Sequence, residues 1–597
     1  MIRNLPYIGV LLKRTLPVLF KEGFSAFWHK AKKISFRRFK TEYDIWVDHY
    51  HLLKKDIKSR EEQIKQFKYK PKISLILPVY DVEKKWLKKA VQSVFDQIYE
   101  NWELCIVDDA SSQKYIKRLL TKYKDNERIN IKFLAKNQGI AGASNEALAI
   151  AQGEFVGFLD HDDQLSKDAL FEVVQLLNKY PQADLIYSDE DKIDLKGKRF
   201  QPFFKPDYSP DLLLSFNYIC HFLVCRRKIL RQINGFQKGL EGSQDYDLVL
   251  RLTEKTDEIY HIPKVLYHWR QIKGSTSVDH KEKAAHIKNS IKAIQEALKR
   301  RGIGGSVEKG IHFDQFESYR VKRKIRNHPL VSVIIPTKDK VSFLRRCIRS
   351  IQEKTDYPNY ELIVVDNKSE KEETLDFLSE LKNEDNVQVI SYDDDYNFSR
   401  INNLAVSESQ GSCILFLNND IQVISNQWMS ALLEHAQREE VGAVGAKLLY
   451  PDDTIQHAGT IVGLGGVAAH SHKKFPKNSN GYFGSLNTIR NYSAVTAACM
   501  MLRKKVFEDC GGFDEENLPI GFNDVDLCLE MKKRGYLIVY TPYAVLIHYE
   551  SQSRSENLNS EEVMFMKKKW GDQLLSDPYY SPNLSYDSED FRIKKLY

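Results

Sequence analysis

The stretch KISLILPVYDVEKKWLKKAVQSV (72–94) decides the fold, because the chain repeats its pattern as LVSVIIPTKDKVSFLRRCIRSI (330–351). In the first copy an apolar run predicts a strand over 72–79, and the next segment predicts a helix over 84–97. Strands and helices go on alternating up to a strand over 154–159. Alternation of this kind is typical of βαβ units, and so of a mostly parallel α/β sheet.

The repeat extends over most of the chain. Three pairs of residues are separated by the same 258 positions: Pro78 and Pro336, Asp108 and Asp366, Asp162 and Asp420. From Asp245 to Asp524 the separation is 279, so the second copy holds about 21 more residues, which we place within 455–484. We predict five divisions: a basic helical segment 1–70, a first domain 71–280, a helical connector 281–328, a second domain 329–575 and a tail 576–597.

Positive charge is concentrated at the N-terminus. The net charge is +8, and residues 1–70 carry about 17 Lys and Arg against about 7 Asp and Glu, so the rest of the chain is close to neutral. This distribution argues against a nucleic-acid-binding body. Segment 5–33, which mixes short apolar runs with Lys and Arg, predicts either a helix on an anionic membrane surface or a helix packed on the body.

Two further observations bear on location and cofactor. No apolar run approaches the roughly 20 residues that span a bilayer, and the eight cysteines form no CxxC pair, which favours a reducing cytosol. The turn after the first strand, PVYDVEKK, has no glycine, whereas a nicotinamide site would need GxGxxG there. We therefore discount a dinucleotide-binding domain.

Five motifs in order, SLILPVYD, CIVDDASS, NQGIAGASNEAL, FLDHDD and GSQDYDLVLR, resemble a family 2 glycosyltransferase with the GT-A fold. In the second copy SVIIPTKD, IVVDNKS, YNFSRINNLAV, FLNND, GGFDE and NDVDLCLEMKKRG resemble the rhamnosyl- and galactofuranosyltransferase branch. The resemblance covers nearly all of 72–280 and 330–556, and its tandem form is similar to bacterial O-antigen and cell-wall polysaccharide glycosyltransferases.

The resemblance implies a divalent cation, Mn²⁺ or Mg²⁺, which neutralises a diphosphate leaving group. The family's DxD motif corresponds to Asp160-His161-Asp162 in the first copy, and to Asn418-Asn419-Asp420, which lacks the first carboxylate, in the second. A histidine completes the shell in the family, and the two candidates are 280 apart, in step with the preceding motif. The implied metal ligands are Asp160, Asp162, His268, Asp420 and His548.

The resemblance also implies a nucleotide-sugar site at the strand ends. Carboxylates suit it because they accept hydrogen bonds from base N–H groups and ribose hydroxyls, although Asp and Asn are also common turn residues. The implied contacts are Pro78, Asp108, Asp109, Asn145 and Asp160, and in the second copy Pro336, Asp366, Asn367, Asn403 and Asn419. The acidic run YSDEDK (187–192) is expected to line the donor site.

The implied general bases are Asp245 and Asp524, with Asp247 and Asp526 as the next candidates. Direct attack opposite the leaving group would invert the anomeric centre, and the same carboxylates would also suit helix N-caps. The predicted insertion contains three histidines, for which two roles stay open: binding a metal or an acceptor phosphate, or serving as polar loop residues. They are His457, His470 and His472.

We therefore expect a bifunctional, inverting hexosyltransferase that moves sugars from nucleotide-diphosphate sugars to a lipid-linked bacterial surface polysaccharide. It would be peripheral to the cytoplasmic face of the plasma membrane. One alternative is that a single copy is catalytic and the other binds glycan, and Asn418 makes the second copy the suspect. The other alternative, a sugar-phosphate nucleotidyltransferase, would need a glycine-rich phosphate loop where the chain has PVYDVEKKW.

Overall fold

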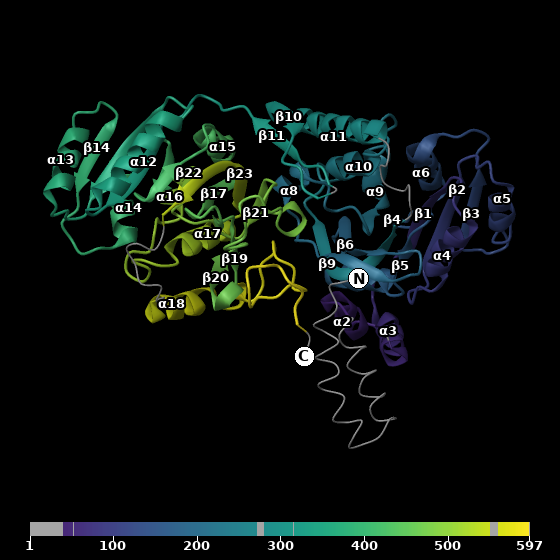
Figure 1. Ribbon diagram of the computed structural model, residues 1–597. Coiled ribbons are helices and arrows are strands. Elements are labelled where there is room, and N and C mark those ends of the chain that lie inside the picture. The colour runs from purple at the N-terminus through teal and green to yellow at the C-terminus, as the bar shows by residue number, and fades with distance from the viewer. Residues whose placement is uncertain (1–39, 52, 272–279, 315, 550–558, 596–597) are drawn as a thin grey trace, which may run out of the picture.

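The computed structural model describes residues 40–51, 53–271, 280–314, 316–549 and 559–595 (Figure 1). The predicted membrane-surface helix within 5–33 lies outside these residues. None of the helices that the structure describes combines the length and the apolar composition needed to cross a bilayer.

The first half of the chain forms a nine-stranded sheet in the order β3-β2-β1-β4-β8-β6-β9-β5, with β7 paired to β6. Strands β3, β2, β1 and β4 are parallel neighbours, β8 is antiparallel to β4 and β6, and β6 is parallel to β9. The strands are β1 (Ile73–Val79), β2 (Trp102–Asp108), β3 (Ile129–Phe133), β4 (Phe155–Phe158), β5 (Gln164–Leu165), β6 (Leu185–Ile193), β7 (Arg199–Phe203), β8 (Leu223–Arg226) and β9 (Ile259–Arg270). The helices are α4 (Lys84–Phe95), α5 (Lys114–Thr121), α6 (Gly139–Ile150), α7 (Ala169–Lys179), α8 (Pro210–Ser215), α9 (Arg227–Gln232) and α10 (Gln244–Leu252).

The second half repeats the same strand order in a ten-stranded sheet, β14-β13-β12-β15-β22-β17-β23-β16, with β18 paired to β17 and β21 to β23. The strands are β12 (Val331–Thr337), β13 (Tyr360–Asp366), β14 (Val387–Ser391), β15 (Cys413–Leu417), β16 (Ile421–Val423), β17 (Val441–Leu449), β18 (Ile455–His457), β21 (Arg490–Tyr492), β22 (Cys499–Arg503) and β23 (Leu537–His548). The helices are α12 (Val341–Lys354), α13 (Glu372–Leu381), α14 (Phe398–Glu408), α15 (Trp428–Ala436), α16 (Lys504–Asp509), α17 (Asn523–Lys533) and α18 (Ser560–Trp570). A separate pair, β19 (Thr460–Val462) and β20 (Ala468–His470), lies in the additional segment. The predicted α/β class with two tandem GT-A-like sheets is confirmed.

The central strands form because their apolar residues are covered on both faces. All seven residues of β2 are buried, which is the pattern of a strand with helices packed on both sides of its sheet. One buried polar group recurs in both halves. The Glu103 carboxylate accepts hydrogen bonds from Ser74 Oγ (2.5 Å) and Gly153 N (2.9 Å), and Glu361 is bound in the same way by Ser332 and Gly411.

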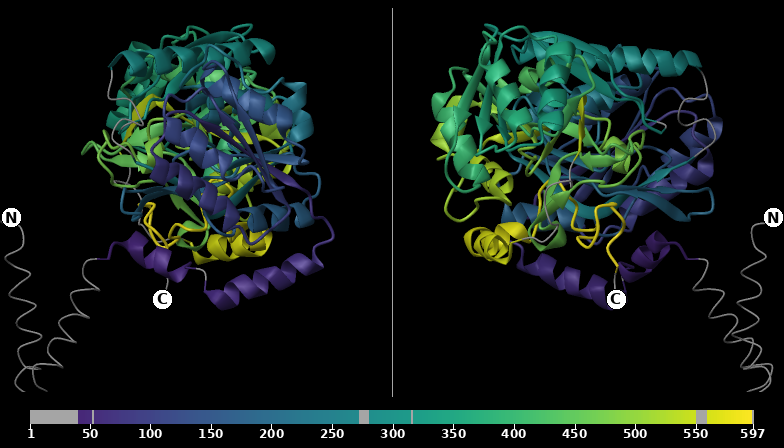
Figure 2. Two further views of the ribbon diagram at one scale, coloured as in Figure 1. Left: turned by 90° about the vertical axis from the view of Figure 1, so that its right-hand side faces the viewer. Right: turned by 60° about the vertical axis from the view of Figure 1, so that its left-hand side comes forward.

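Helices α2 (Glu42–His49) and α3 (Lys54–Gln66) lie along the underside of the first half (Figures 1 and 2). Trp46 packs on Phe204 with ring centroids 5.3 Å apart, and Tyr43 Oη donates to Asp191 Oδ2 at 2.6 Å. Between the halves the chain forms α11 (His280–Arg300) and a two-stranded sheet of β10 (Gly305–Lys309) and β11 (Tyr319–Arg323).

The two halves lie side by side and meet where α8 of the first packs against β21 of the second (Figure 1). Asp211 of α8 is 2% exposed, pairs with Arg438 at 2.6 Å and accepts from Asn491 Nδ2 at 2.9 Å. Since removing one partner of a buried ion pair leaves an uncompensated charge, loss of either Asp211 or Arg438 would destabilise the junction. The C-terminal segment (576–595) adds to this junction, because Asn583 Nδ2 donates to Asp189 Oδ2 at 3.1 Å.

Candidate active site

In each half the ends of the parallel strands bring predicted polar residues to one edge of the sheet. Asp108 ends β2 opposite Val79 of β1, and Asp366 ends β13 opposite Thr337 of β12. Asp160 follows β4, which pairs with β1 on its other side. Ligands of open α/β sheets bind beyond the carboxyl ends of such strands.

Asp108 and Asp366 form the same local turn in the two halves. Asp108 Oδ1 accepts from Ser111 N at 3.3 Å, and Asp366 Oδ1 accepts from Ser369 N at 3.2 Å. One oxygen of each carboxylate is thus used by the turn, which leaves the other for a further donor. The prolines predicted for this edge lie one position before the strand ends and are half-buried: Pro78 and Pro336.

The next residues hold neighbouring loops. Asp109 is 2% exposed and its Oδ1 accepts from Gln138 N at 2.7 Å. Asn367 is 3% exposed and its Nδ2 donates to the carbonyls of Tyr392 (3.3 Å) and Asp394 (3.0 Å). Both side chains therefore shape the loop beside the strand ends.

Asn145 and Asn403 have a role that the sequence did not predict. Asn145 Nδ2 donates to the carbonyl of Phe236 at 2.9 Å, and its Oδ1 accepts from Phe236 N at 2.8 Å. Asn403 makes the same pair of bonds to Phe513, at 2.9 and 3.0 Å. Each amide fixes the main chain of a loop, and for this reason we leave both residues out of the proposed donor site.

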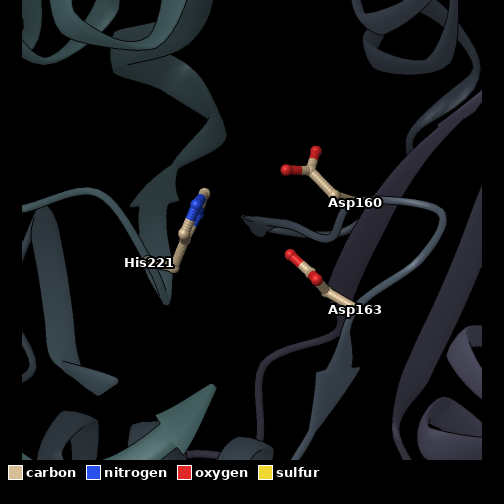
Figure 3. A group of neighbouring side chains, drawn as sticks. All are labelled: Asp160, Asp163 and His221. Carbon is tan, nitrogen blue, oxygen red and sulfur yellow. The ribbon is translucent and has the colours of Figure 1, made fainter. Parts of the chain in front are cut away.

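Asp160, Asp163 and His221 form a cluster at the edge of the first sheet (Figure 3). Each offers one ligand atom, and these atoms all lie within 4.8 Å of one another. Figure 3 shows the two carboxylates and the imidazole facing a common space. The His221 ring stacks on Tyr267, with centroids 4.5 Å apart, which fixes the imidazole relative to β9.

Asp163 is the structural member of this cluster. It is 1% exposed, and its two oxygens accept from Tyr267 Oη (2.7 Å) and Arg270 N (2.6 Å). Burial raises its pKa, and the nearby carboxylates of Asp162 and Asp160 raise it further. Burial also raises the pKa of Asp162, whose main-chain carbonyl accepts from Arg270 Nε at 2.7 Å.

His268 binds a carboxylate other than the predicted Asp160 and Asp162, and we therefore leave it out of the proposed ligand set. Its Nδ1 lies 2.6 Å from Asp191 Oδ1, and Asp191 also binds Tyr43 of α2. His268 therefore belongs to the contact that anchors the N-terminal helix.

The sequence matched His268 with His548 at a separation of 280, whereas the two sheets correspond at a separation of 279 in this region. Strand pairing places Asp191 opposite His268 and Leu449 opposite Ile547, so the counterpart of His268 is Ile547, at a separation of 279. The counterpart of His548 is Trp269. Because neighbouring residues of a strand point to opposite faces, a separation of 280 joins residues on different faces of the two sheets.

In the second half the predicted histidine does reach the predicted carboxylate. His548 Nε2 lies 3.2 Å from Asp420 Oδ1 and 3.3 Å from Asn418 Nδ2. His548 is 5% exposed, and its buried Nδ1 has no hydrogen-bond partner among the described residues. Asn419 Nδ2 donates to Thr337 Oγ1 at 2.9 Å, at the end of β12.

The two proposed general bases, Asp245 and Asp524, lie at the starts of α10 and α17 and are partly accessible. Asp245 is half-buried, and its Oδ2 accepts from Asn217 Nδ2 at 3.0 Å. Burial raises its pKa, and two members of the cluster act on it as charged neighbours, since His221 lowers this pKa and Asp160 raises it. Asp524 is half-buried too, and accepts from Ala497 N at 3.1 Å.

The alternative carboxylates on the same helices are buried and pair with neighbouring side chains. Asp247 is completely buried and pairs with Arg251 at 2.6 Å one turn along α10. Asp526 accepts from Trp570 Nε1 at 2.8 Å and pairs with Lys569 of α18 at 2.8 Å. Both hold helices in place and have no open side.

The three histidines of the insertion divide into two groups. His472 Nε2 accepts from Tyr482 N at 3.1 Å, and burial lowers its pKa to about 3. His457 Nδ1 lies 2.8 Å from His470 Nδ1. Burial lowers the pKa of His457, and His470 and His548 lower it further, so this pair lies beside the second-half site.

Sequence reasoning missed His221 and the residues that hold it. His221 N donates to Glu190 Oε2 at 3.1 Å, and Lys205 Nζ donates to the His221 carbonyl at 2.5 Å. Within the acidic run 187–192, Glu190 is thus the residue that contacts His221. Strand β22 of the second half corresponds to β8 of the first, and on this alignment Ala498 is the counterpart of His221. The repeat therefore gave no indication that His221 is functional.

The residues present fit a hard divalent cation, with a different set in each half. In the first half Asp160 and His221 are open, whereas Asp163 already accepts two hydrogen bonds. In the second half Asp420 and His548 lie together. Mg²⁺ and Mn²⁺ commonly take one or two protein carboxylates and complete their shell with phosphate and water.

Two sheets of one strand order, each with carboxylates at the ends of its parallel strands, have the arrangement expected of GT-A-like domains. The family model described as glycosyl transferase family 2 matches residues 74–233 and 332–511. These matches cover more than half of the chain, and the chain therefore belongs to glycosyltransferase family 2.

Relatives are similar over both halves. The uncharacterized protein y4gI of Sinorhizobium fredii is 41% identical over 541 residues, 89% of this chain and 59% of its own. The O-antigen biosynthesis protein RfbC of Myxococcus xanthus is 38% identical over 544 residues, 90% of this chain and 42% of its own. The chain thus spans only part of these relatives. The crystal structure of S. aureus TarS 1–349 with UDP covers 38% of this chain and 65% of its own, at 20% identity and a TM-score of 0.31.

Proposed function

We propose that the chain is a bifunctional, inverting glycosyltransferase that adds sugars from nucleotide-diphosphate sugars to a growing bacterial surface polysaccharide. The observation that carries the proposal is that each half sets a half-buried carboxylate from a helix start, Asp245 or Asp524, near the polar residues at its sheet edge. The name of the Myxococcus xanthus relative supports polysaccharide assembly as the setting. The proposed lipid-linked acceptor and cytoplasmic membrane face rest on the basic composition of residues 1–70.

The donor nucleotide would lie over the strand ends. Asp108 and Asp366 each keep one carboxylate oxygen for a base N–H or a ribose hydroxyl. A divalent cation, when bound by Asp160 and His221 or by Asp420 and His548, would neutralise the charge of the diphosphate leaving group.

The carboxylates at the helix starts would take the proton of the acceptor hydroxyl. In the first half Asn217 Nδ2 donates to one oxygen of Asp245, which leaves the other oxygen for the acceptor hydroxyl. As the proton leaves, the hydroxyl oxygen attacks the sugar carbon from the face opposite the diphosphate, so the anomeric centre is inverted.

One observation favours a second candidate function, in which only the first half is catalytic. The second half has Asn418 and Ala498 where the first has Asp160 and His221. In that case the second half would bind glycan without transferring sugar.

Ligand-induced stabilisation tests the donor class. We expect one nucleoside diphosphate, of a series presented with and without Mn²⁺, to raise the melting temperature of the full chain. Binding at 100 times Kd stabilises by about 2.7 kcal/mol. Glycosyl transfer should then release that diphosphate from its sugar donor in the absence of any triphosphate. Consumption of a triphosphate together with a sugar phosphate would instead point to a nucleotidyltransferase.

The histidine assignment gives a separate prediction. In a chain carrying Asp420→Asn, which weakens the second site, His221→Ala should weaken Mn²⁺ binding by about tenfold or more. His268→Leu should leave it unchanged within about twofold, because His268 binds Asp191. Titration calorimetry with Mn²⁺ measures both. Loss of Mn²⁺ binding in His268→Leu, with none in His221→Ala, would reverse the assignment.

A further inference from the structure

A small cavity lies where the two halves and the C-terminal segment meet. Its lining comes from all three parts, with Phe204 from the first half, Phe483 from the second and Phe591 from the C-terminal segment. Its volume of about 10 Å³ corresponds to room for about one water-sized sphere. Arg490, in β21, is the one charged side chain among the described lining residues.

None of the described residues supplies a counter-charge to Arg490. It is 5% exposed, and its Nε is buried without a hydrogen-bond partner. The described residues provide neither an acceptor nor a carboxylate for its guanidinium, which lies 5.0 Å from the centroid of the Tyr492 ring. Arg438, at the same junction, shows the usual arrangement, because it pairs with Asp211 at 2.6 Å and with Glu440 at 2.9 Å.

The surroundings of Arg490 are also basic. Lys447 is 7% exposed, and its Nζ donates to the Lys477 carbonyl at 3.0 Å. Burial lowers the pKa of Lys447 to about 8. Burial is the main cause of the lowered pKa of His472. The positive charge of Arg490 lowers this pKa further, whereas Asp590 raises it. An isolated buried charge is strongly unfavourable unless it is paired.

We propose that this cavity binds a small monovalent anion of halide size, with Arg490 as its charge partner. The cavity has room for about one water-sized sphere, so a halide would enter as a single ion in place of that water. The hydroxyl-bearing residues Tyr579 and Ser581 also line it. The bound anion becomes part of the junction, so that the docking of the two halves depends on halide.

Bromide tests this proposal directly. In crystals of the full chain grown with sodium bromide, we expect an anomalous peak beside the Arg490 guanidinium. In solution, replacing sodium gluconate by sodium chloride at constant ionic strength should raise the melting temperature to a plateau, as binding to one site requires. Arg490→Met should remove both effects, and Arg490→Lys, which keeps the charge, should retain part of the chloride dependence.

Arg534→Met is the matched control, because Arg534 is an exposed arginine at the end of α17. It should leave the chloride dependence unchanged. No bromide peak together with equal melting temperatures in gluconate and chloride would overturn the proposal and leave water as the occupant. A chloride effect that persists in Arg490→Met would also overturn it, since the ion would then act elsewhere.

Discussion

Replacing Asp245 by asparagine should abolish one glycosyl transfer and leave a second one intact, and Asp524→Asn should do the reverse. An amide cannot accept the acceptor proton, and loss of a positioned base lowers the rate by about 10²- to 10⁴-fold. Asparagine keeps the size of the side chain, so the unfolding midpoint should change little. Product analysis by mass spectrometry, with donors added singly and together, separates the two transfers.

Glu241→Gln and Glu530→Gln are suitable controls, because they remove a carboxylate near the same helices, α10 and α17, without touching the proposed bases. Both should transfer at the parent rate. If Asp524→Asn matched the parent in every transfer, the second half would not be an enzyme, and the single-site alternative would hold. If either variant lost both transfers, the two halves would not act as separate sites.

Lys205→Met should lower the free energy of unfolding by about 3–5 kcal/mol, the cost of leaving a buried charge without its partner. Lys205 is completely buried, and its Nζ donates to Glu190 Oε2 (3.0 Å) and to the carbonyls of Ile219 (2.7 Å) and His221 (2.5 Å). Methionine fills the space but satisfies none of these acceptors. Urea unfolding followed by fluorescence measures the change.

The same variant should also impair first-half transfer more than second-half transfer, because Lys205 and Glu190 together position the peptide of His221. Lys264→Met is the control, since Lys264 is half-exposed and pairs with Glu172 at 2.7 Å. In this variant Glu172 keeps its pair with Arg60 at 3.2 Å, so little stability should be lost. Equal stability of Lys205→Met and Lys264→Met would show that the buried network does not hold this part of the fold.

The sequence was sufficient for the fold because the repeat and the strand–helix alternation depend on local apolar patterns. It was also sufficient to bring Asp420 and His548 together. It did not predict the contact of His268 with Asp191. Separations of 280 and 279 look equivalent in a sequence, but they place a residue on opposite faces of the sheet. It missed His221, because the loop that carries it is fixed by the long-range partners Lys205 and Glu190.

The junction between the halves has a consequence for dissecting the protein. A fragment ending before β12 would expose Phe203 and Phe204 and would leave the Asp211 carboxylate without Arg438. A fragment beginning there would carry Arg438 without Asp211, and β21 would become an open strand edge. One transfer step is therefore best studied with point variants of the whole polypeptide, since truncation between the halves would yield two poorly folded, aggregation-prone fragments.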